Sequence, residues 1–476
     1  MKPRHIVIIG GGITGLSAAH TLYQRMRELG PELQITVLER ENQLGGKIRT
    51  HREGGFVMEE GPDSLLARKP AGVRLIEQLG VTSEIVNSRE EGMKTYIVHN
   101  GRLQTLPART NMGIPAHWPS FFDTPLLSSA GKLRALLDLV LPPMEITGDV
   151  SIGAFLRRRL GDELVDHLIE PLLGGIYAGR LDDLSLLSTY PQFRQLEQKY
   201  GSLIRGSMRQ RQAAPTLTSN HGRSVFITLK NGLQTLVERL HDELHPHISL
   251  LTQAEVTRIE PTEGGAYRIA ANVAGEVRTF AADAIICTAP AQVAATLLSP
   301  IVKEAQALAD IPYVSTAVVL LGYQRAQLNV DLDGAGFLVP RKEGRTITAC
   351  TWTSSKWPHT TPEDQALVRC YVGRAGQQEA LALPDDELLQ RVMRDLADIT
   401  GLTARPWFTR VVRWNAAMPQ FLVHHQEKLA SVTEALATHA PGLFLAGAGY
   451  HAVGIPDCIA NGEKTAEAAL AHIQSL

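Results

Sequence analysis

The stretch that decides the fold is Val7-Ile8-Ile9-Gly10-Gly11-Gly12-Ile13-Thr14-Gly15-Leu16. The apolar run that ends at Ile9 predicts a buried parallel strand, and the residues from Leu16 to about Leu29 predict a helix. The three glycines between them have the spacing G-x-G-x-x-G. The first permits a tight turn, the second lets a pyrophosphate approach the backbone, and the third lets the helix pack closely on the strand.

A second apolar run, Leu33 to Leu38, ends in Glu39, an acidic residue where a ribose hydroxyl needs an acceptor. The helix N-terminus would offer free N–H groups and a positive dipole end to the phosphates. A βαβ turn with a purely structural role is the alternative. The unit therefore predicts a dinucleotide site, and its candidate binding residues are Gly10, Gly11, Gly12, Ile13, Thr14, Gly15, Glu39 and Arg40.

Two glycine-containing segments follow this unit. Gly45-Gly46-Lys47-Ile48-Arg49-Thr50 begins after a gap of five residues from Glu39, and Glu59-Glu60-Gly61-Pro62-Asp63-Ser64 comes next. Either alone could be an ordinary surface turn. Glu-x5-Gly-Gly after a dinucleotide fold resembles the superfamily of flavin-dependent amine oxidases and protoporphyrinogen oxidases. That resemblance implies FAD rather than NAD, covered by both loops, with the candidate contacts Gly46, Lys47, Gly61, Pro62, Asp63 and Ser64.

Composition limits the other possibilities. With 476 residues and a net charge of -2, the chain is too long for one core and has no basic excess for nucleic acid. Its 47 Lys and Arg residues still leave cations for an acidic substrate. The four cysteines form no C-x-x-C pair, so neither a metal site nor a disulfide framework is expected, and a reducing cytoplasm fits best.

No signal peptide is expected, because the N-terminal residues run straight into the first predicted strand. No transmembrane span is predicted either, because no apolar run reaches the roughly 20 residues that a span needs. The nearest candidate, Leu126 to Leu141, carries Lys132, Arg134 and Asp138. A half-buried helix of a soluble protein is one interpretation. Peripheral contact of an amphipathic helix with a membrane is the other.

The order of patterns predicts two interleaved parts. The first is an α/β, Rossmann-like FAD-binding domain of residues 1–95, 225–300 and 440–476. The second is an α+β substrate-binding region of residues 96–224 and 301–439, helical over 110–215 and an antiparallel sheet over 310–425. Asn100-Gly101 predicts a hairpin turn. Residues 170–179 are predicted to be a glycine-rich turn, and residues 205–224 a polar surface loop.

The C-terminal segment is predicted to close the cofactor site. A last strand ends at Gly447, and Gly454-Ile455-Pro456 opens a helix in which the proline suits the first turn. A helix N-terminus near the flavin would stabilise its reduced anion. Cys458 lies beside this helix start, where a small buried side chain and a covalent flavin link are the two interpretations.

Taken together, the chain resembles the protoporphyrinogen and coproporphyrinogen oxidase family, and its soluble Gram-positive branch in particular. Further marks are Glu60 to Lys69, Leu168 to Gly179, Thr348 to Thr353 and Val453 to Cys458. The fold implied is of the amine oxidase and p-hydroxybenzoate hydroxylase type. The resemblance also implies that Val256 contacts adenine through its backbone. Trp414 is expected in the core, with a flavin-side position, which makes it a candidate cofactor contact, as its alternative.

The activity implied is FAD-dependent oxidation of coproporphyrinogen III to coproporphyrin III in haem biosynthesis. O2 would reoxidise the flavin and give H2O2. The flavin would abstract hydride from a meso carbon, so no catalytic residue, general base or metal is nominated and catalysis would be mainly positioning. Transient contact with a ferrochelatase is a further expectation.

Substrate choice is an electrostatic question, because coproporphyrinogen III carries four propionates and protoporphyrinogen IX two. Arginine is the best bidentate partner of a carboxylate. Lys69 and Arg180 are the candidate propionate partners, with Arg68 beside the first, and a solvated surface cation is the alternative for each. Ile176 and Tyr177 are candidates for packing on the tetrapyrrole or for the core.

Three other functions remain open from the sequence. Protoporphyrinogen IX oxidation lies within the same family. A flavin amine oxidase usually has an aromatic cage and Ala-Gly-Thr in its C-terminal loop, whereas this chain is 5% aromatic and has Ala446-Gly447-Ala448. A non-catalytic flavoprotein that carries a tetrapyrrole to a chelatase belongs to a different class.

Overall fold

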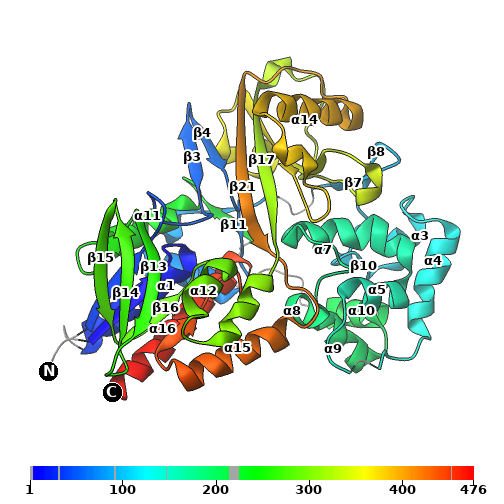
Figure 1. The fold of residues 1–476 in the computed structure, drawn as a ribbon. Coiled ribbons are helices and arrows are strands. Elements are labelled where there is room, and N and C mark those ends of the chain that lie inside the picture. Colours follow the sequence, from blue (N-terminus) through cyan, green and yellow to red (C-terminus); the bar gives the residue numbers. More distant parts are fainter. Residues whose placement is uncertain (1–3, 30–32, 90–92, 146, 214–223, 452) are drawn as a thin grey trace.

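The computed structural model describes residues 4–29, 33–89, 93–145, 147–213, 224–451 and 453–476. Two sheets and a helical lobe account for most of it (Figure 1). The parallel sheet lies in the half of the molecule that holds the two termini, the second sheet is mainly antiparallel, and the helical lobe lies on the side away from the termini. In these ranges, no helix has both the length and the apolar character needed to cross a membrane.

The parallel sheet has five strands in the order β12-β2-β1-β16-β22. Its strands come from three distant stretches of the chain: β1 Arg4–Ile9, β2 Leu33–Leu38, β12 Ser249–Leu251, β16 Ala284–Cys287 and β22 Leu443–Leu445. In β1, Ile6 and Ile8 face one hydrophobic core while Val7 and Ile9 face another. A strand buried on both faces has no polar side to alternate with, which is why the sequence shows an unbroken apolar run.

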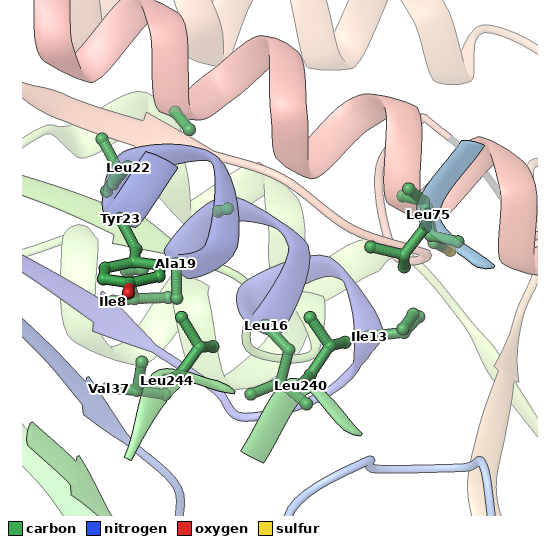
Figure 2. Packing of buried hydrophobic residues seen from close by; sticks show 14 of the residues in the cluster. Ile8, Ile13, Leu16, Ala19, Leu22, Tyr23, Val37, Leu75, Leu240 and Leu244 are labelled. Carbon is green, nitrogen blue, oxygen red and sulfur yellow. The ribbon is translucent and has the colours of Figure 1, made fainter. Parts of the chain in front are cut away.

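Helices cover one face of this sheet. The helices are α1 Ile13–Leu29, α11 Gln234–Leu244 and α16 Ile455–Gln474, joined by α2 Pro70–Gln78. Figure 2 shows Leu16 and Tyr23 of α1 packed near Leu240 and Leu244 of α11. α1 and α16 meet almost backbone to backbone, because a Cβ on Gly462 would lie 2.3 Å from the Thr14 carbonyl oxygen.

A small antiparallel sheet and two helices cover the other face. They are β13 Ala254–Pro261, β14 Tyr267–Val273, β15 Glu276–Ala282, α12 Ala291–Leu298 and α15 His425–His439. β13, β14 and β15 form a meander in which each strand pairs with the next. The Rossmann-like unit predicted from the first residues is therefore complete, with a core on each side of its sheet.

The second sheet has seven strands in the order β21-β17-β20-β19-β18-β7-β8. Their bounds are β7 Thr95–His99, β8 Arg102–Thr105, β17 Tyr313–Gln324, β18 Gly336–Leu338, β19 Ile347–Thr351, β20 Gln365–Val372 and β21 Phe408–Pro419. All the pairs are antiparallel except β18 with β7. The Asn100-Gly101 turn joins β7 to β8 as predicted, with φ of 52° and 73°. α14 Asp385–Thr400 packs on this sheet.

The helical lobe lies between β8 and β11 in the chain. Its helices are α3 Trp118–Asp123, α4 Ser129–Leu136, α5 Ile152–Leu160, α6 Asp162–Leu164, α7 Glu170–Tyr177, α8 Leu186–Thr189, α9 Pro191–Tyr200 and α10 Leu203–Ala213, with a π-helical turn, η3 Val165–Ile169, between α6 and α7. Two sequence expectations fail here. The predicted turn over 170–179 is helical as far as Tyr177, and the predicted loop over 205–224 is helical as far as Ala213; residues 214–223 lie outside the described ranges.

Burial explains the first error. Gly174 and Gly175 cost a helix roughly 1 kcal/mol each relative to alanine, but Leu173 and Tyr177 are buried in the core of the lobe. Tyr190 donates a hydrogen bond from Oη to the Leu173 carbonyl at 3.2 Å, and the ring of Tyr177 packs against those of Tyr190 and Phe421. Tertiary packing therefore outweighs the low helix propensity. The turn begins at Ala178, in a left-handed conformation with φ of 50°.

Short elements link the sheets and the lobe. The short strands are β3 Thr50–Glu53, β4 Phe56–Glu59, β5 Leu65–Leu66, β6 Ile85–Asn87, β9 Thr110–Asn111, β10 Ile114–Pro115 and β11 Phe226–Leu229. The short helices are η1 Thr82–Glu84, η2 Leu137–Leu139, η4 Lys303–Asp310, η5 Arg325–Gln327, η6 Arg341–Glu343, α13 Thr353–Lys356, η7 Pro358–Thr360 and η8 Glu379–Ala382. The β3–β4 hairpin connects the two loops that the sequence places over the cofactor.

Candidate functional site

The turn between β1 and α1 uses its glycines in two different ways. Gly10 has φ of +107°, and a Cβ on Gly15 would lie 2.0 Å from the Gly10 carbonyl oxygen, so both positions require glycine for the turn itself. A Cβ on Gly12, in contrast, would have no atom of the described chain within 4 Å. Gly12 therefore borders open space at the N-terminus of α1, where a phosphate group can approach the backbone.

Glu39 is fixed directly beneath this turn. Its side chain is 9% exposed; Oε2 accepts a hydrogen bond from Gly11 N at 2.7 Å, and Oε1 accepts one from Glu41 N at 2.8 Å. Arg40 points to solvent and pairs with Glu41 at 2.9 Å. The carboxylate is thus held at the end of β2, next to the glycine turn.

Val256 lies on the strand that begins beside Glu39. Ala254 N at the start of β13 donates to the Glu39 carbonyl oxygen at 2.8 Å. Val256 is 8% exposed, and the register of β13 shifts between it and Arg258. The structure therefore brings Val256 to the same end of the parallel sheet as Glu39.

The first cover loop, residues 45–50, is bound to the glycine turn. Gly45 N donates to the Gly11 carbonyl oxygen at 2.8 Å, and a Cβ on Gly46 would lie 3.3 Å from Gly12 Cα. Lys47 reaches the other way and donates through Nζ to the Ala417 carbonyl oxygen, beyond the middle of β21. Lys47 is exposed to solvent, but desolvation by the surrounding protein still lowers its pKa.

The second cover loop, residues 59–64, crosses the first. A Cβ on Gly61 would lie 1.9 Å from the Lys47 carbonyl oxygen, so the two backbones are in contact and only glycine fits. Trp414 Nε1 donates to the Glu60 carbonyl oxygen at 2.7 Å. Pro62 and Asp63 follow, and Ser64 Oγ donates to Asp63 Oδ1 at 2.7 Å.

A cation of the first cover loop, Arg49, faces the ring of Trp414 in β21. The Arg49 guanidinium carbon is 5.1 Å from the centre of the Trp414 ring, within the range of a cation–π contact. Its buried Nε has no hydrogen-bond partner among the residues that the structure describes. The junction of the loops therefore presents both an aromatic face and an unpaired donor.

The start of α16 closes the same region. Gly447 has φ of +114°, a conformation that residues with a Cβ rarely adopt, and its N donates to Asn461 Oδ1 at 2.7 Å. A Cβ on Gly447 would lie 3.7 Å from Thr14 Oγ1, which places this turn against the start of α1. α16 begins after Gly454, at Ile455 and Pro456. Cys458 is 4% exposed, and burial raises the pKa of its thiol to about 11.

The predicted substrate residues have different surroundings. Lys69 Nζ is bonded to the Asp457 carboxylate in the first turn of α16, and Arg68 is exposed. Ile176 is 54% exposed, whereas Tyr177 is 9% exposed and packs in the lobe. Arg180 is exposed at the surface and lies 3.5 Å from Asp183.

Comparison with known proteins identifies the family of this chain. The family model for flavin-containing amine oxidoreductases matches residues 13–470. The coproporphyrinogen III oxidase of Bacillus subtilis (strain 168) is 39% identical to this chain over 473 residues, which cover 99% of each protein. The chain belongs to the protoporphyrinogen and coproporphyrinogen oxidase family of flavoproteins.

Two other matches agree with this membership. Protoporphyrinogen oxidase 1, chloroplastic, of Arabidopsis thaliana is 30% identical over 480 residues, covering 97% of this chain and 87% of that protein. A crystal structure of a protein from Exiguobacterium sp. 255-15 superposes with a TM-score of 0.86 at 36% identity, covering 99% of this chain and all of the other. The predicted fold class is therefore confirmed over the whole length of this family member.

FAD is the cofactor of this family member, and the site fits it. In chemical character, the open space at Gly12 suits a pyrophosphate, and the buried carboxylate of Glu39 suits a ribose. Lys47, whose pKa is lowered by desolvation, suits an electron-rich ring system. The predicted residues of the glycine turn, the two cover loops and the start of α16 are joined by direct contacts. Arg40 points away from them.

Sequence reasoning missed several residues that contact the predicted site. They are Arg49, Lys356, Arg369, Arg410, Asp457 and Asn461. The sequence could have indicated Arg369, because it is the one charged residue in the apolar run Ala366 to Val372. A charge in a central strand requires a buried partner. The partners of Arg369 come from distant parts of the chain, so the sequence pattern did not indicate where they lie.

Exchanging single glycines for alanine should separate cofactor binding from folding. Gly12→Ala adds a methyl group only to the open space, so the chain should fold with wild-type stability while FAD affinity falls at least tenfold. Gly15→Ala places its methyl group on the Gly10 carbonyl oxygen and should lower the thermal midpoint of the apoprotein as well. Differential scanning calorimetry and FAD titration of the apoproteins measure both. Equal effects of the two variants on stability would contradict this assignment.

A buried carboxyl in the β3–β4 hairpin gives a pH test. Glu59 accepts hydrogen bonds from Thr50 Oγ1 at 2.9 Å and Leu233 N at 2.6 Å, and burial raises its pKa from 4.5 to about 7. The folded chain therefore binds more protons than the unfolded chain between these pH values, and stability falls as pH rises through that window. Between pH 5 and pH 8, the free energy of unfolding of Glu59→Gln should therefore fall by about 2–3 kcal/mol less than that of the wild type.

Urea unfolding at the two pH values measures the effect. Glu53→Gln is the matched control, because Glu53 is on the same hairpin with a side chain 63% exposed. That variant should follow the wild-type profile. A Glu59→Gln profile parallel to the wild type would show that Glu59 is ionised in the folded protein at both pH values.

Proposed function

We propose that this chain oxidises coproporphyrinogen III to coproporphyrin III, with FAD as the electron carrier, O2 as the acceptor and H2O2 as the product. The observation that carries the proposal is the 39% identity to the Bacillus subtilis coproporphyrinogen III oxidase over 99% of both chains. When bound, FAD accepts electron pairs from the porphyrinogen and passes them to O2. One peroxide is expected for each pair of electrons.

In this proposal the chain binds and orients rather than transfers protons. Residues 1–95, 225–300 and 440–476 hold FAD. The turn from Gly10 to Gly15 takes the pyrophosphate, Glu39 the ribose hydroxyls and the Val256 backbone the adenine. The two cover loops, Trp414, Gly447 and the start of α16 surround the flavin. No general base is proposed, because pyrrole N–H protons can leave to solvent once the meso carbon is positioned.

Residues 96–224 and 301–439 form the substrate region in this proposal. Ile176 has the exposure needed to contact an apolar ring, and Arg180 can bind a propionate bidentately. Lys69 is already paired with Asp457, so a propionate there would have to compete with that carboxylate. Arg68 beside it is exposed and supplies a second cation at the same position.

A paired aerobic assay tests the proposed substrate. Coproporphyrinogen III and protoporphyrinogen IX are supplied separately at equal concentration, and porphyrin fluorescence and peroxide are followed together. Coproporphyrin should form faster, with peroxide in proportion to the electron pairs removed. The purified protein without FAD is the matched control and should not exceed the non-enzymatic rate.

Other outcomes identify other functions. Faster oxidation of protoporphyrinogen IX would favour the second candidate, which the 30% identity to the Arabidopsis thaliana protein supports. Failure with both porphyrinogens, together with peroxide release from an amine, would replace the proposal with amine oxidation. Bound flavin with no turnover of any of them would favour a tetrapyrrole carrier.

A further inference from the structure

Three side chains of the seven-stranded sheet reach across to the second cover loop. Arg410 Nε of β21 donates to Glu60 Oε1 at 2.6 Å, and Trp414 Nε1 of the same strand donates to the Glu60 carbonyl oxygen at 2.7 Å. Arg369 of β20 donates through Nη2 to the Gly61 carbonyl oxygen. Of these three, Arg369 is the most deeply buried, with 2% of its surface exposed.

The guanidinium of Arg369 lies near a carboxylate inside the protein. Its Nη1 lies 3.8 Å from Asp63 Oδ2, and Lys356 Nζ lies at the same distance from that oxygen. Burial alone would raise the pKa of Asp63, but Lys356 and Arg369 lower it, so the carboxyl is an anion. The Arg369 guanidinium also lies over the Tyr371 ring, 4.8 Å from its centre. A buried cation held this way has a fixed orientation.

Gly61 connects the Arg369 guanidinium to the first cover loop. Because a Cβ at Gly61 would lie 1.9 Å from the Lys47 carbonyl oxygen, the Gly61 backbone rests directly on the first cover loop. That loop is hydrogen-bonded to the glycine turn through Gly45 N and the Gly11 carbonyl oxygen. A guanidinium that holds the Gly61 carbonyl therefore fixes both loops relative to the phosphate-binding turn.

We propose that Arg369 is a positioning residue for the flavin: a buried cation of the substrate sheet that holds the two cover loops, through the Gly61 carbonyl and Asp63, in the geometry that binds FAD. It acts through the loops and is not a catalytic residue. The proposal rests on the proposed function only in taking residues 45–50 and 59–64 as the flavin cover.

Arg369→Met tests the proposal directly, because methionine fills a similar volume without the charge or the donors. Loss of a charge-assisted hydrogen bond should raise the FAD dissociation constant about tenfold or more and change the visible absorption spectrum of the bound flavin. With saturating FAD and coproporphyrinogen III, kcat should fall by about the same factor while KM changes less than twofold. Arg369→Lys retains the charge and should restore part of the affinity.

The matched control is Arg413→Met on β21, which is separated from β20 by β17. Arg413 is partly buried and bonds to the carbonyl oxygens of Leu381 and Leu383 and to Asp385, away from both cover loops. Its loss should leave FAD affinity and the flavin spectrum unchanged.

Each result decides the matter. Wild-type FAD affinity and spectrum in Arg369→Met, or an equal loss of FAD in Arg413→Met, would overturn the proposal. If Arg369→Met does not fold, Arg369→Lys decides alone: FAD binding several-fold weaker than the wild type supports positioning, and wild-type binding refutes it. FAD titration needs no porphyrinogen, so failure of the proposed function in the wild-type protein would leave this test valid.

Discussion

The rest of the site depends on one contact, the crossing of the Gly61 backbone over the Lys47 carbonyl. The atoms are so close that a single methyl group on Gly61 would overlap the oxygen. One of the crossing loops is hydrogen-bonded to the glycine turn, and the other to the seven-stranded sheet. The crossing therefore sets the distance between the glycine turn and the seven-stranded sheet. The proposed mechanism relies on positioning and needs such a fixed reference.

Electrostatics reinforces this junction. Three charges near the crossing have identifiable partners: Glu39 takes two backbone N–H groups, Lys47 donates to a carbonyl of the seven-stranded sheet, and Asp63 lies between two cations. Moving the seven-stranded sheet away would separate the buried pair of Asp63 and Arg369, which is costly. This pair therefore helps to hold the seven-stranded sheet on the second cover loop.

The sequence was most informative where local chemistry decides the structure. Gly10 and Gly15 are required by the turn itself, and the unbroken apolar run of β1 is required by its two cores, so both could be read without a structure. Glu39 was placed correctly at the end of β2, but its hydrogen bonds to Gly11 and Glu41 could not be foreseen.

The sequence was least informative where distant segments meet. Residues 170–177 look like a turn because of two glycines, and they are helical because Leu173 and Tyr177 are buried against Tyr190 and Phe421. The sequence shows Arg369 as a charge in an apolar strand. It does not show its partners Gly61 and Asp63, because they precede it by some 300 residues. Lys69 was expected to face a substrate carboxylate, and the carboxylate beside it is Asp457 of the chain itself.

The central claim is that electrons pass from a porphyrinogen to FAD bound at this junction. Its most direct test is anaerobic: the FAD-loaded protein is mixed with coproporphyrinogen III in the absence of O2, and the visible flavin absorbance is followed. The account predicts that the flavin bleaches as porphyrin forms, at least as fast as aerobic turnover, and that its colour returns when O2 is admitted. A flavin that stays oxidised while the tetrapyrrole binds would contradict the account.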